Sequence, residues 1–119
     1  MNLLHNNTLG IDIGSTTVKI AVLDNEQHIL FTDYERHYAN IQETLALLLS
    51  KAKEKLGEMT VSPSITGSGG LTLSGHLNVP FTQEVVAVAT ALQDYAPQTD
   101  VAIELGGEDA KIIYFTGGI

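Results

Sequence analysis

The segment from Asp12 to Lys19 carries side chains that could bind a phosphate. A carboxylate at the end of an apolar stretch is followed by a glycine, three hydroxyl side chains and a lysine. Glycine lets a backbone approach a ligand closely, successive N–H groups in a turn form an anion-binding concavity, and hydroxyls and a lysine add donors and charge. Asp12 could hold magnesium through water, as this ion prefers. The candidate phosphate-binding residues are Gly14, Ser15, Thr16, Thr17 and Lys19.

A second segment near the end of the chain repeats this pattern of strand, carboxylate, glycines, carboxylate and lysine. It consists of Glu104, Leu105, Gly106, Gly107, Glu108, Asp109, Ala110 and Lys111. Either segment alone could be an ordinary hairpin with a polar turn. Together they are more specific, because a phosphate clamp needs donors from two sides. The first segment does not have the glycine spacing of a P-loop or of a dinucleotide-binding fingerprint.

Hydrophobic patterns predict the elements that position these two turns. An α-helix over residues 41–56 follows from its apolar spacing, with Asn40 and Glu43 as a capping box and Gly57 as its end. We expect strands over 9–13, 18–23, 28–37, 61–66 and 81–84, helices over 71–77 and 85–95, and a hairpin of 101–105 and 111–115. Pro63 is unfavourable within its strand. This order predicts an α/β layered domain with a mixed five-stranded sheet covered by helices.

Composition excludes several other classes of protein. The chain has 119 residues, a net charge of -8 and no cysteine. An acidic chain is a poor nucleic-acid binder, and the lack of cysteine excludes disulfides and thiolate metal ligands. The four histidines are scattered without the spacing of metal ligands: His5, His28, His37 and His76. No segment has the apolar length of a membrane span, and no signal peptide is recognisable, so we expect a cytoplasmic protein.

The two turns resemble those of the actin-like ATPase superfamily, in which each lobe opens with a β-hairpin and the two hairpin turns face each other across the nucleotide phosphates. The amino-acid sequence of these motifs is similar to that of the activators of 2-hydroxyacyl-CoA dehydratases and the ATPase subunits of benzoyl-CoA reductases. The similarity lies in residues 10–17, in the Thr-Gly turn at 66–70, in 83–85, and in 105–111, where that family has Ile-Gly-Gly-Gln-Asp-Ser-Lys. It covers nearly the whole chain.

This resemblance implies a ribonuclease-H-like first lobe over residues 1–97 and the opening hairpin of a second lobe over 98–119. Because a lone hairpin is marginally stable, we expect the natural protein to continue. The resemblance further implies that Asp12 serves magnesium, that Glu104 and Asp109 orient the metal or the attacking water, and that Gly106 and Gly107 supply backbone donors. Glu84 would face the cleft or be a solvated carboxylate. We expect Gly69 and Gly70 to form only the entry to a helix.

In that family, hydrolysis of ATP to ADP with magnesium drives an electron from a 4Fe-4S cluster to a dehydratase or reductase component. The cluster is held between two subunits by cysteines, which this chain lacks. The whole protein would therefore be a homodimeric ATPase and this chain alone inactive. Three departures from the family pattern put hydrolysis in doubt: Glu104 for Asp, Glu108 for Gln, and Ala110 for Ser. Two alternatives stay open, namely a non-hydrolysing regulatory nucleotide-binding module and a lobe of a sugar or acetate kinase.

Overall fold

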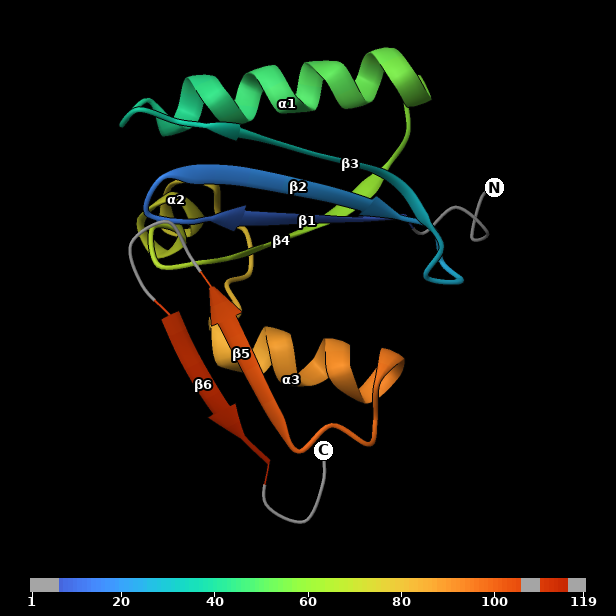
Figure 1. The fold of residues 1–119 in the computed structure, drawn as a ribbon. Helices are drawn as coiled ribbons and strands as arrows, with labels where there is room; N and C mark the ends of the chain where they lie inside the picture. The colour runs from blue at the N-terminus through green and yellow to red at the C-terminus, as the bar shows by residue number, and fades with distance from the viewer. Residues whose placement is uncertain (1–6, 106–109, 116–119) are drawn as a thin grey trace.

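The computed structural model describes residues 7–105 and 110–115, and it contains the predicted alternation of strands and helices (Figure 1). The elements are β1 (Asn7–Ile13), β2 (Thr17–Leu23), β3 (Ile29–Arg36), α1 (Ile41–Leu56), β4 (Val61–Thr66), α2 (Gly70–Leu77), α3 (Glu84–Tyr95), β5 (Val101–Leu105) and β6 (Ala110–Tyr114). In this described part, no helix is both long enough and apolar enough to cross a membrane.

Strands β1 to β4 form one mixed sheet in the order β3-β2-β1-β4. The first three strands are an antiparallel meander, and β4 returns through α1 to lie parallel to β1. The predicted fifth strand, 81–84, is reduced to a single parallel bridge between Phe81 and Ile65. We expected Pro63 to interrupt its strand, but β4 is continuous over Val61–Thr66. Because β4 lies at the edge of the four-stranded sheet, the missing N–H of the proline breaks no ladder there.

The two faces of this sheet differ in character because successive side chains of a strand point to opposite sides. On one face, Leu9, Ile11 and Ile13 of β1 lie opposite apolar residues of β2 and are buried under α1. Figure 1 shows α1 covering this face and α3 lying on the other side of the sheet. The second face carries Asp12 and Lys19, which are partners in the β1–β2 register. The hydrophobic core therefore lies on the α1 side of the sheet, and the polar side chains of Asp12 and Lys19 lie on the opposite side.

Helix α1 has the predicted bounds but not the predicted cap. Asn40 precedes it and Gly57 ends it at a φ of 79°, yet the Asn40 side chain makes no capping hydrogen bond. Thr44 instead donates its hydroxyl to the Asn40 carbonyl at 2.7 Å. Leu48, which is fully buried, anchors the helix on the sheet. Apolar packing rather than a capping box therefore fixes this helix.

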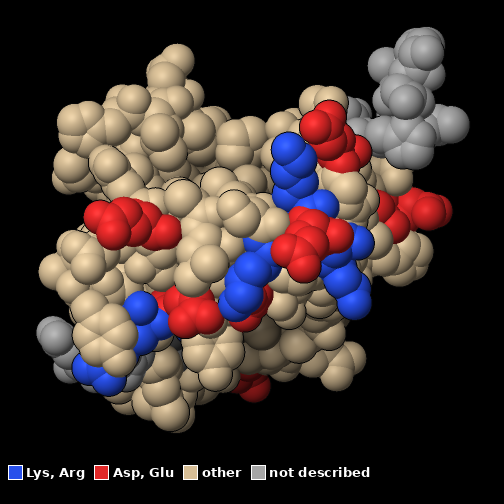
Figure 2. All heavy atoms as spheres, turned by 90° about the horizontal axis from the view of Figure 1, so that it is seen from above, with Lys and Arg blue, Asp and Glu red and all other residues tan. Residues whose placement is uncertain are grey.

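The outer side of α1 and β3 carries interspersed acidic and basic side chains (Figure 2). Lys51 of α1 lies 2.9 Å from an Asp33 carboxylate oxygen and 3.1 Å from one of Glu35, both on β3. Strand β3 is an edge of the described sheet. Charged side chains on an edge strand oppose pairing with another chain.

Strands β5 and β6 form a separate two-stranded antiparallel sheet, as predicted for this hairpin. Its two strands lie beside α3 in Figure 1, away from α1. One face of the hairpin is apolar and largely exposed, with Ile103 at 65% and Ile112 at 57%. Ile113, on the opposite face, is buried. The hairpin therefore packs inward on one side only.

Candidate functional site

The Gly14–Thr17 turn joins β1 to β2 at the end of the sheet. The Gly14 N–H donates to the Thr17 carbonyl at 2.9 Å, which closes the turn. Asp12 and Lys19, each a candidate binding residue from the sequence, flank it as register partners. The structure thus places a carboxylate and an ammonium-bearing side chain side by side at the base of a hydroxyl-rich turn.

A groove of about 960 Å³ runs between this polar face of the sheet and α3. Asp12, Lys19 and Thr66 line its sheet side, and Val86 and Thr90 line its helix side. Helix α3 has no buried residue, so it does not fill the space. A ligand that reached Asp12 would enter a concave site, as small-molecule sites usually are.

Charges from three elements act on Asp12. Partial burial raises the pKa of its carboxyl, Lys19 lowers it, Glu84 raises it and Lys111 lowers it. Burial has the largest effect because it disfavours the charged form. Raised pKa values of this kind, with a specific charged neighbour in a groove, are typical of functional sites.

The sequence predicted Glu84 at the end of a strand, but in the structure it is the first residue of α3. Its carboxylate lies 3.1 Å from the Lys111 ammonium on β6, and its side chain is only 20% exposed. The solvated-carboxylate alternative for Glu84 is therefore wrong. Both members of the pair also act on the pKa of the Asp12 carboxyl, so Lys111 of the second candidate segment contributes to the electrostatics of the first.

The rest of that second segment can be placed only in part. The Glu104 backbone lies opposite Lys111 in the β5–β6 register. Gly106, Gly107, Glu108 and Asp109 lie outside the described residues, so the structure does not test their expected roles.

The loop between β4 and α2 packs directly against Asp12. Gly67 has a φ of +100°, and an added Cβ there would meet the Ile13 carbonyl oxygen and the Asp12 carboxylate. The Gly69 N–H donates to the Ile13 carbonyl at 2.9 Å, and α2 begins at Gly70. The expected role of Gly69 and Gly70 as a helix entry is thus what the structure shows, with close backbone approach as the reason for glycine.

Thr66 entered the sequence analysis only as part of the Thr-Gly turn and not as a candidate site residue, although it lies next to Asp12 in the parallel β1–β4 register. Its hydroxyl oxygen is buried and has no hydrogen-bond partner among the described residues. A buried hydroxyl without a partner is costly and is often explained by a bound ligand or ion. With the Asp12 carboxylate it provides two neighbouring oxygen groups, the donor type that magnesium takes. These residues therefore fit the predicted ion in chemistry.

His37 was interpreted as an incidental histidine and is instead buried beneath the turn. Its side chain is within hydrogen-bonding distance of Gly14 and Ala39. No local sequence signal marks this role, because Gly14 lies 23 residues earlier in the chain, in the turn between β1 and β2.

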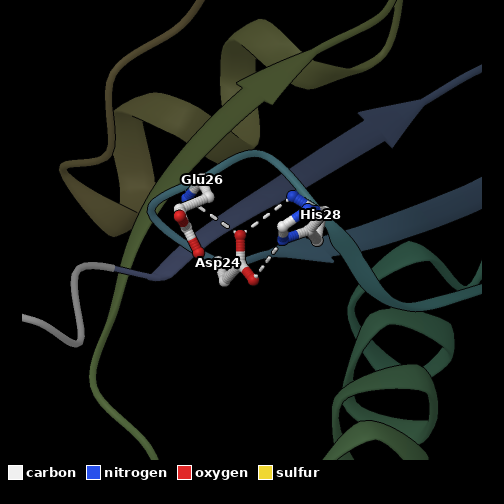
Figure 3. A group of neighbouring side chains, drawn as sticks. All are labelled: Asp24, Glu26 and His28. Atoms are coloured by element: carbon white, nitrogen blue, oxygen red, sulfur yellow. Dashed lines mark hydrogen bonds and ion pairs between the residues drawn. The ribbon is translucent and has the colours of Figure 1, made fainter.

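A second cluster of potential ligands lies at the far end of β2. Asp24, Glu26 and His28 bring a nitrogen and carboxylate oxygens within 4.8 Å of one another (Figure 3). Asp24 accepts from the N–H groups of Glu26 and His28, each at 2.9 Å, and its other oxygen lies 3.1 Å from the His28 ring. The His28 N–H is the main cause of a lowered Asp24 pKa. These bonds describe a capped turn, and we assign it no metal.

Neither a family model nor a curated protein matches this chain, but solved structures do. Component A of the (R)-2-hydroxyglutaryl-CoA dehydratase of Acidaminococcus fermentans is similar at a TM-score of 0.79 and 23% identity, over 94% of this chain and 44% of that one. The activator of the 2-hydroxyisocaproyl-CoA dehydratase of Clostridium difficile, with bound ADPNP, gives 0.68 and 24%, over 92% and 41%. A glucokinase of the ROK family from Streptomyces griseus, with glucose and AMPPNP, gives 0.60 and 22%, over 92% and 45%.

The chain therefore has the actin-like ATPase fold, a ribonuclease-H-like arrangement, as predicted. A dehydratase component A and a dehydratase activator are among the solved proteins that it resembles, which agrees with the resemblance inferred from its motifs. At these identities the likeness establishes the fold alone. The chain spans less than half the length of each of these proteins.

Proposed function

We propose that this chain is the nucleotide-phosphate-binding part of an ATPase of the dehydratase-activator kind. The observation that carries the proposal is the convergence on Asp12 of Lys19 from the first turn and of Glu84 and Lys111 from α3 and β6. Basic side chains from two separate hairpins act electrostatically on one carboxylate. That arrangement suits an anionic ligand with a metal ion bound between the hairpins.

In this proposal each group has one task. Gly14, Ser15, Thr16 and Thr17 present donors to phosphate oxygens, and Lys19 adds charge. Asp12 would hold magnesium, which when bound neutralises phosphate charge and orients it. Gly106 and Gly107 would supply donors from the other side, and Glu104 and Asp109 would orient the metal or a water. Catalysis of phosphoryl transfer is mostly positioning and charge stabilisation, which such residues can provide.

The coupled activity is a further part of the proposal. Hydrolysis would change the angle between two lobes, residues 1–97 forming the first and 98–119 opening the second, and so drive an electron from a 4Fe-4S cluster to a dehydratase or reductase component. Since this chain has no cysteine, the cluster ligands would lie outside it. A homodimeric assembly and a cytoplasmic location stay predictions of the same kind.

Nucleotide binding to the chain itself is the first test. We expect addition of magnesium and ADP to shift the amide NMR signals of Gly14 to Thr17 saturably. The affinity should be weak, on the order of 1 mM, because half of the clamp is absent. Asp12→Ala should abolish these shifts. Asp24→Ala, at the opposite end of β2, is the matched control and should leave them unchanged. No shift at the turn in the wild-type chain would contradict the proposal.

A non-hydrolysing regulatory module is the second candidate function. It is favoured by Glu104 and Glu108, which stand where the activator family has Asp and Gln. One added methylene displaces a carboxylate enough to misplace a water. In a protein that contains both lobes, Glu104→Asp should then restore turnover. Turnover by the unchanged protein would rule this candidate out.

A further inference from the structure

The turn between β1 and β2 is fixed by a histidine from the end of β3. The His37 N–H donates to the Thr16 carbonyl at 2.9 Å, and its ring Nε2 lies 3.1 Å from the Gly14 carbonyl oxygen. The residue is only 8% exposed. Two carbonyl groups of the candidate phosphate-binding turn are thus bonded to the same residue.

A third contact determines which ring nitrogen carries the proton. The Ala39 N–H lies 3.0 Å from His37 Nδ1 and donates to it, so Nδ1 must offer its lone pair. In a neutral imidazole the other nitrogen then carries the hydrogen. Nε2 is therefore the donor, and the Gly14 carbonyl accepts from it.

The backbone is strained where this contact is made. Tyr38 and Ala39 have φ values of 46° and 67°, in the left-handed region that non-glycine residues rarely adopt. These two residues reverse the chain so that the Ala39 N–H meets the ring, and the Asn40 N–H then donates to the His37 carbonyl at 2.7 Å. Strain that persists in this way is held by the surrounding structure and is common at functional sites.

Fixing the Gly14 carbonyl also fixes the next N–H. A trans peptide is planar, so its C=O and the following N–H point in opposite directions. The bond from His37 to the Gly14 carbonyl therefore turns the Ser15 N–H away from the imidazole. The turn is closed on its other side by the Gly14 N–H, which donates to Thr17.

We propose that His37 is a positioning residue for the phosphate-binding turn. Its Nε2–H holds the Gly14–Ser15 peptide so that the Ser15 N–H is presented to a phosphate oxygen before the ligand arrives. The proposal rests on the proposed nucleotide-phosphate binding and adds a residue outside the turn. His37 itself does not touch the ligand; it acts through Gly14.

Two substitutions separate the two ring contacts. In His37→Gln, the amide nitrogen is as many bonds from Cβ as imidazole Nε2, so it can still donate to the Gly14 carbonyl. In His37→Asn, the amide oxygen is as many bonds from Cβ as Nδ1, so it can still accept from Ala39 but cannot reach Gly14. The exposed His76 in α2 supplies the control, His76→Asn.

The experiment combines ring nitrogen NMR, amide hydrogen exchange and titration with magnesium and ADP. We expect the Nε2–H tautomer in the wild-type chain. His37→Asn should bind roughly three- to tenfold more weakly, since one hydrogen bond is lost. Its Gly14 amide, which donates to the Thr17 carbonyl, should exchange faster because the turn is held less firmly. His37→Gln should bind within about twofold of wild type, and the two variants should have similar melting temperatures.

Each outcome has a distinct meaning. The Nδ1–H tautomer would overturn the proposal without any variant, because Nε2 could not donate to Gly14. Equal affinity of His37→Asn and wild type would overturn it as well, as would equal losses in both variants. If the wild-type chain shows no shift with magnesium and ADP, the proposed function fails instead. The tautomer and the Gly14 exchange rate would then still decide whether His37 positions the turn.

Discussion

The Lys111 ammonium lies 3.1 Å from the Glu84 carboxylate, which joins strand β6 to the first turn of α3. The two side chains are only 34% and 20% exposed, so solvent screens the pair less than it would an exposed one. Both members also influence the Asp12 carboxyl, in opposite directions. A structural contact between two distant segments thus sets the charge environment of the candidate site.

The first prediction concerns the pKa of Asp12. Lys19→Met and Lys111→Met should each raise it, because each removes a positive charge that favours the carboxylate, and Lys19 should have the larger effect. Glu84→Gln should lower it, because a negative charge is removed. Carbon NMR titration of the Asp12 carboxyl measures all three. Lys55→Met, at the C-terminal end of α1, is the control and should change nothing. Identical titrations in all variants would mean that these charges do not act on one site.

The second prediction follows from the sign of the Asp12 shift. A carboxyl whose folded pKa is raised stabilises the fold at pH values below its unfolded pKa, which for an aspartate is near 3.8. This stability is lost as the pH rises through the folded pKa. Asp12→Asn should therefore raise the melting temperature at neutral pH while abolishing magnesium-dependent nucleotide binding. The increase in melting temperature should disappear at pH values below the pKa of Asp12 in the unfolded chain.

Asp33 provides a control of opposite sign. Its pKa is lowered, mainly by the Lys51 hydrogen bond, so its stabilising contribution is present above the unfolded pKa and lost as the pH falls through the folded pKa. Asp33→Asn should lower the melting temperature at neutral pH and have no effect in acid. If both variants shift the melting temperature in the same direction at neutral pH, the assigned Asp12 environment is incorrect.

Local patterns in the sequence were sufficient for the elements of the fold. The apolar spacing of 41–56 predicted α1, and β-branched runs separated by polar turns predicted the meander of β1 to β3. Asp12 and Lys19 were predicted as candidate binding residues of one segment, because a carboxylate and a lysine flank its short polar turn. These features depend on contacts between residues close in the chain, which periodicity and turn chemistry record.

Features set by long-range packing could not be predicted in this way. Thr66 meets Asp12 only because α1 returns β4 parallel to β1, and the register of that pairing has no local signal. His37 reaches Gly14 through a left-handed turn at two residues that are not glycine. Residues 81–84 were predicted as a strand, but only Phe81 bridges to β4 before α3 begins. The sequence therefore predicts the residues of the turn between β1 and β2, but not the residues that long-range packing brings to it.

The third prediction tests the close packing of Gly67 against Asp12. Gly67→Ala should destabilise the fold by about 1–3 kcal/mol through backbone strain, and the added Cβ should further displace the Ile13 carbonyl and the Asp12 carboxylate. Gly57→Ala is the matched control, because Gly57 has a φ of +79° but no atom within 4 Å of the added Cβ. Urea unfolding should show a larger loss for Gly67→Ala. Equal losses would mean that only the backbone angle matters and that the loop does not press on Asp12.

The last prediction separates function from stability at Thr66. Replacing its hydroxyl by a methyl group in Thr66→Val removes a buried polar atom that has no described partner, so the free energy of unfolding should stay the same or rise by up to about 1–3 kcal/mol. Nucleotide binding with magnesium should nevertheless weaken, because a ligand oxygen beside Asp12 is lost. Thr44→Val is the control, since the Thr44 hydroxyl donates to the Asn40 carbonyl and its removal should cost about 1 kcal/mol. Denaturant unfolding and NMR titration provide the two measurements. A Thr66→Val chain that is less stable than wild type and binds equally well would show that the hydroxyl serves the fold and not the ligand.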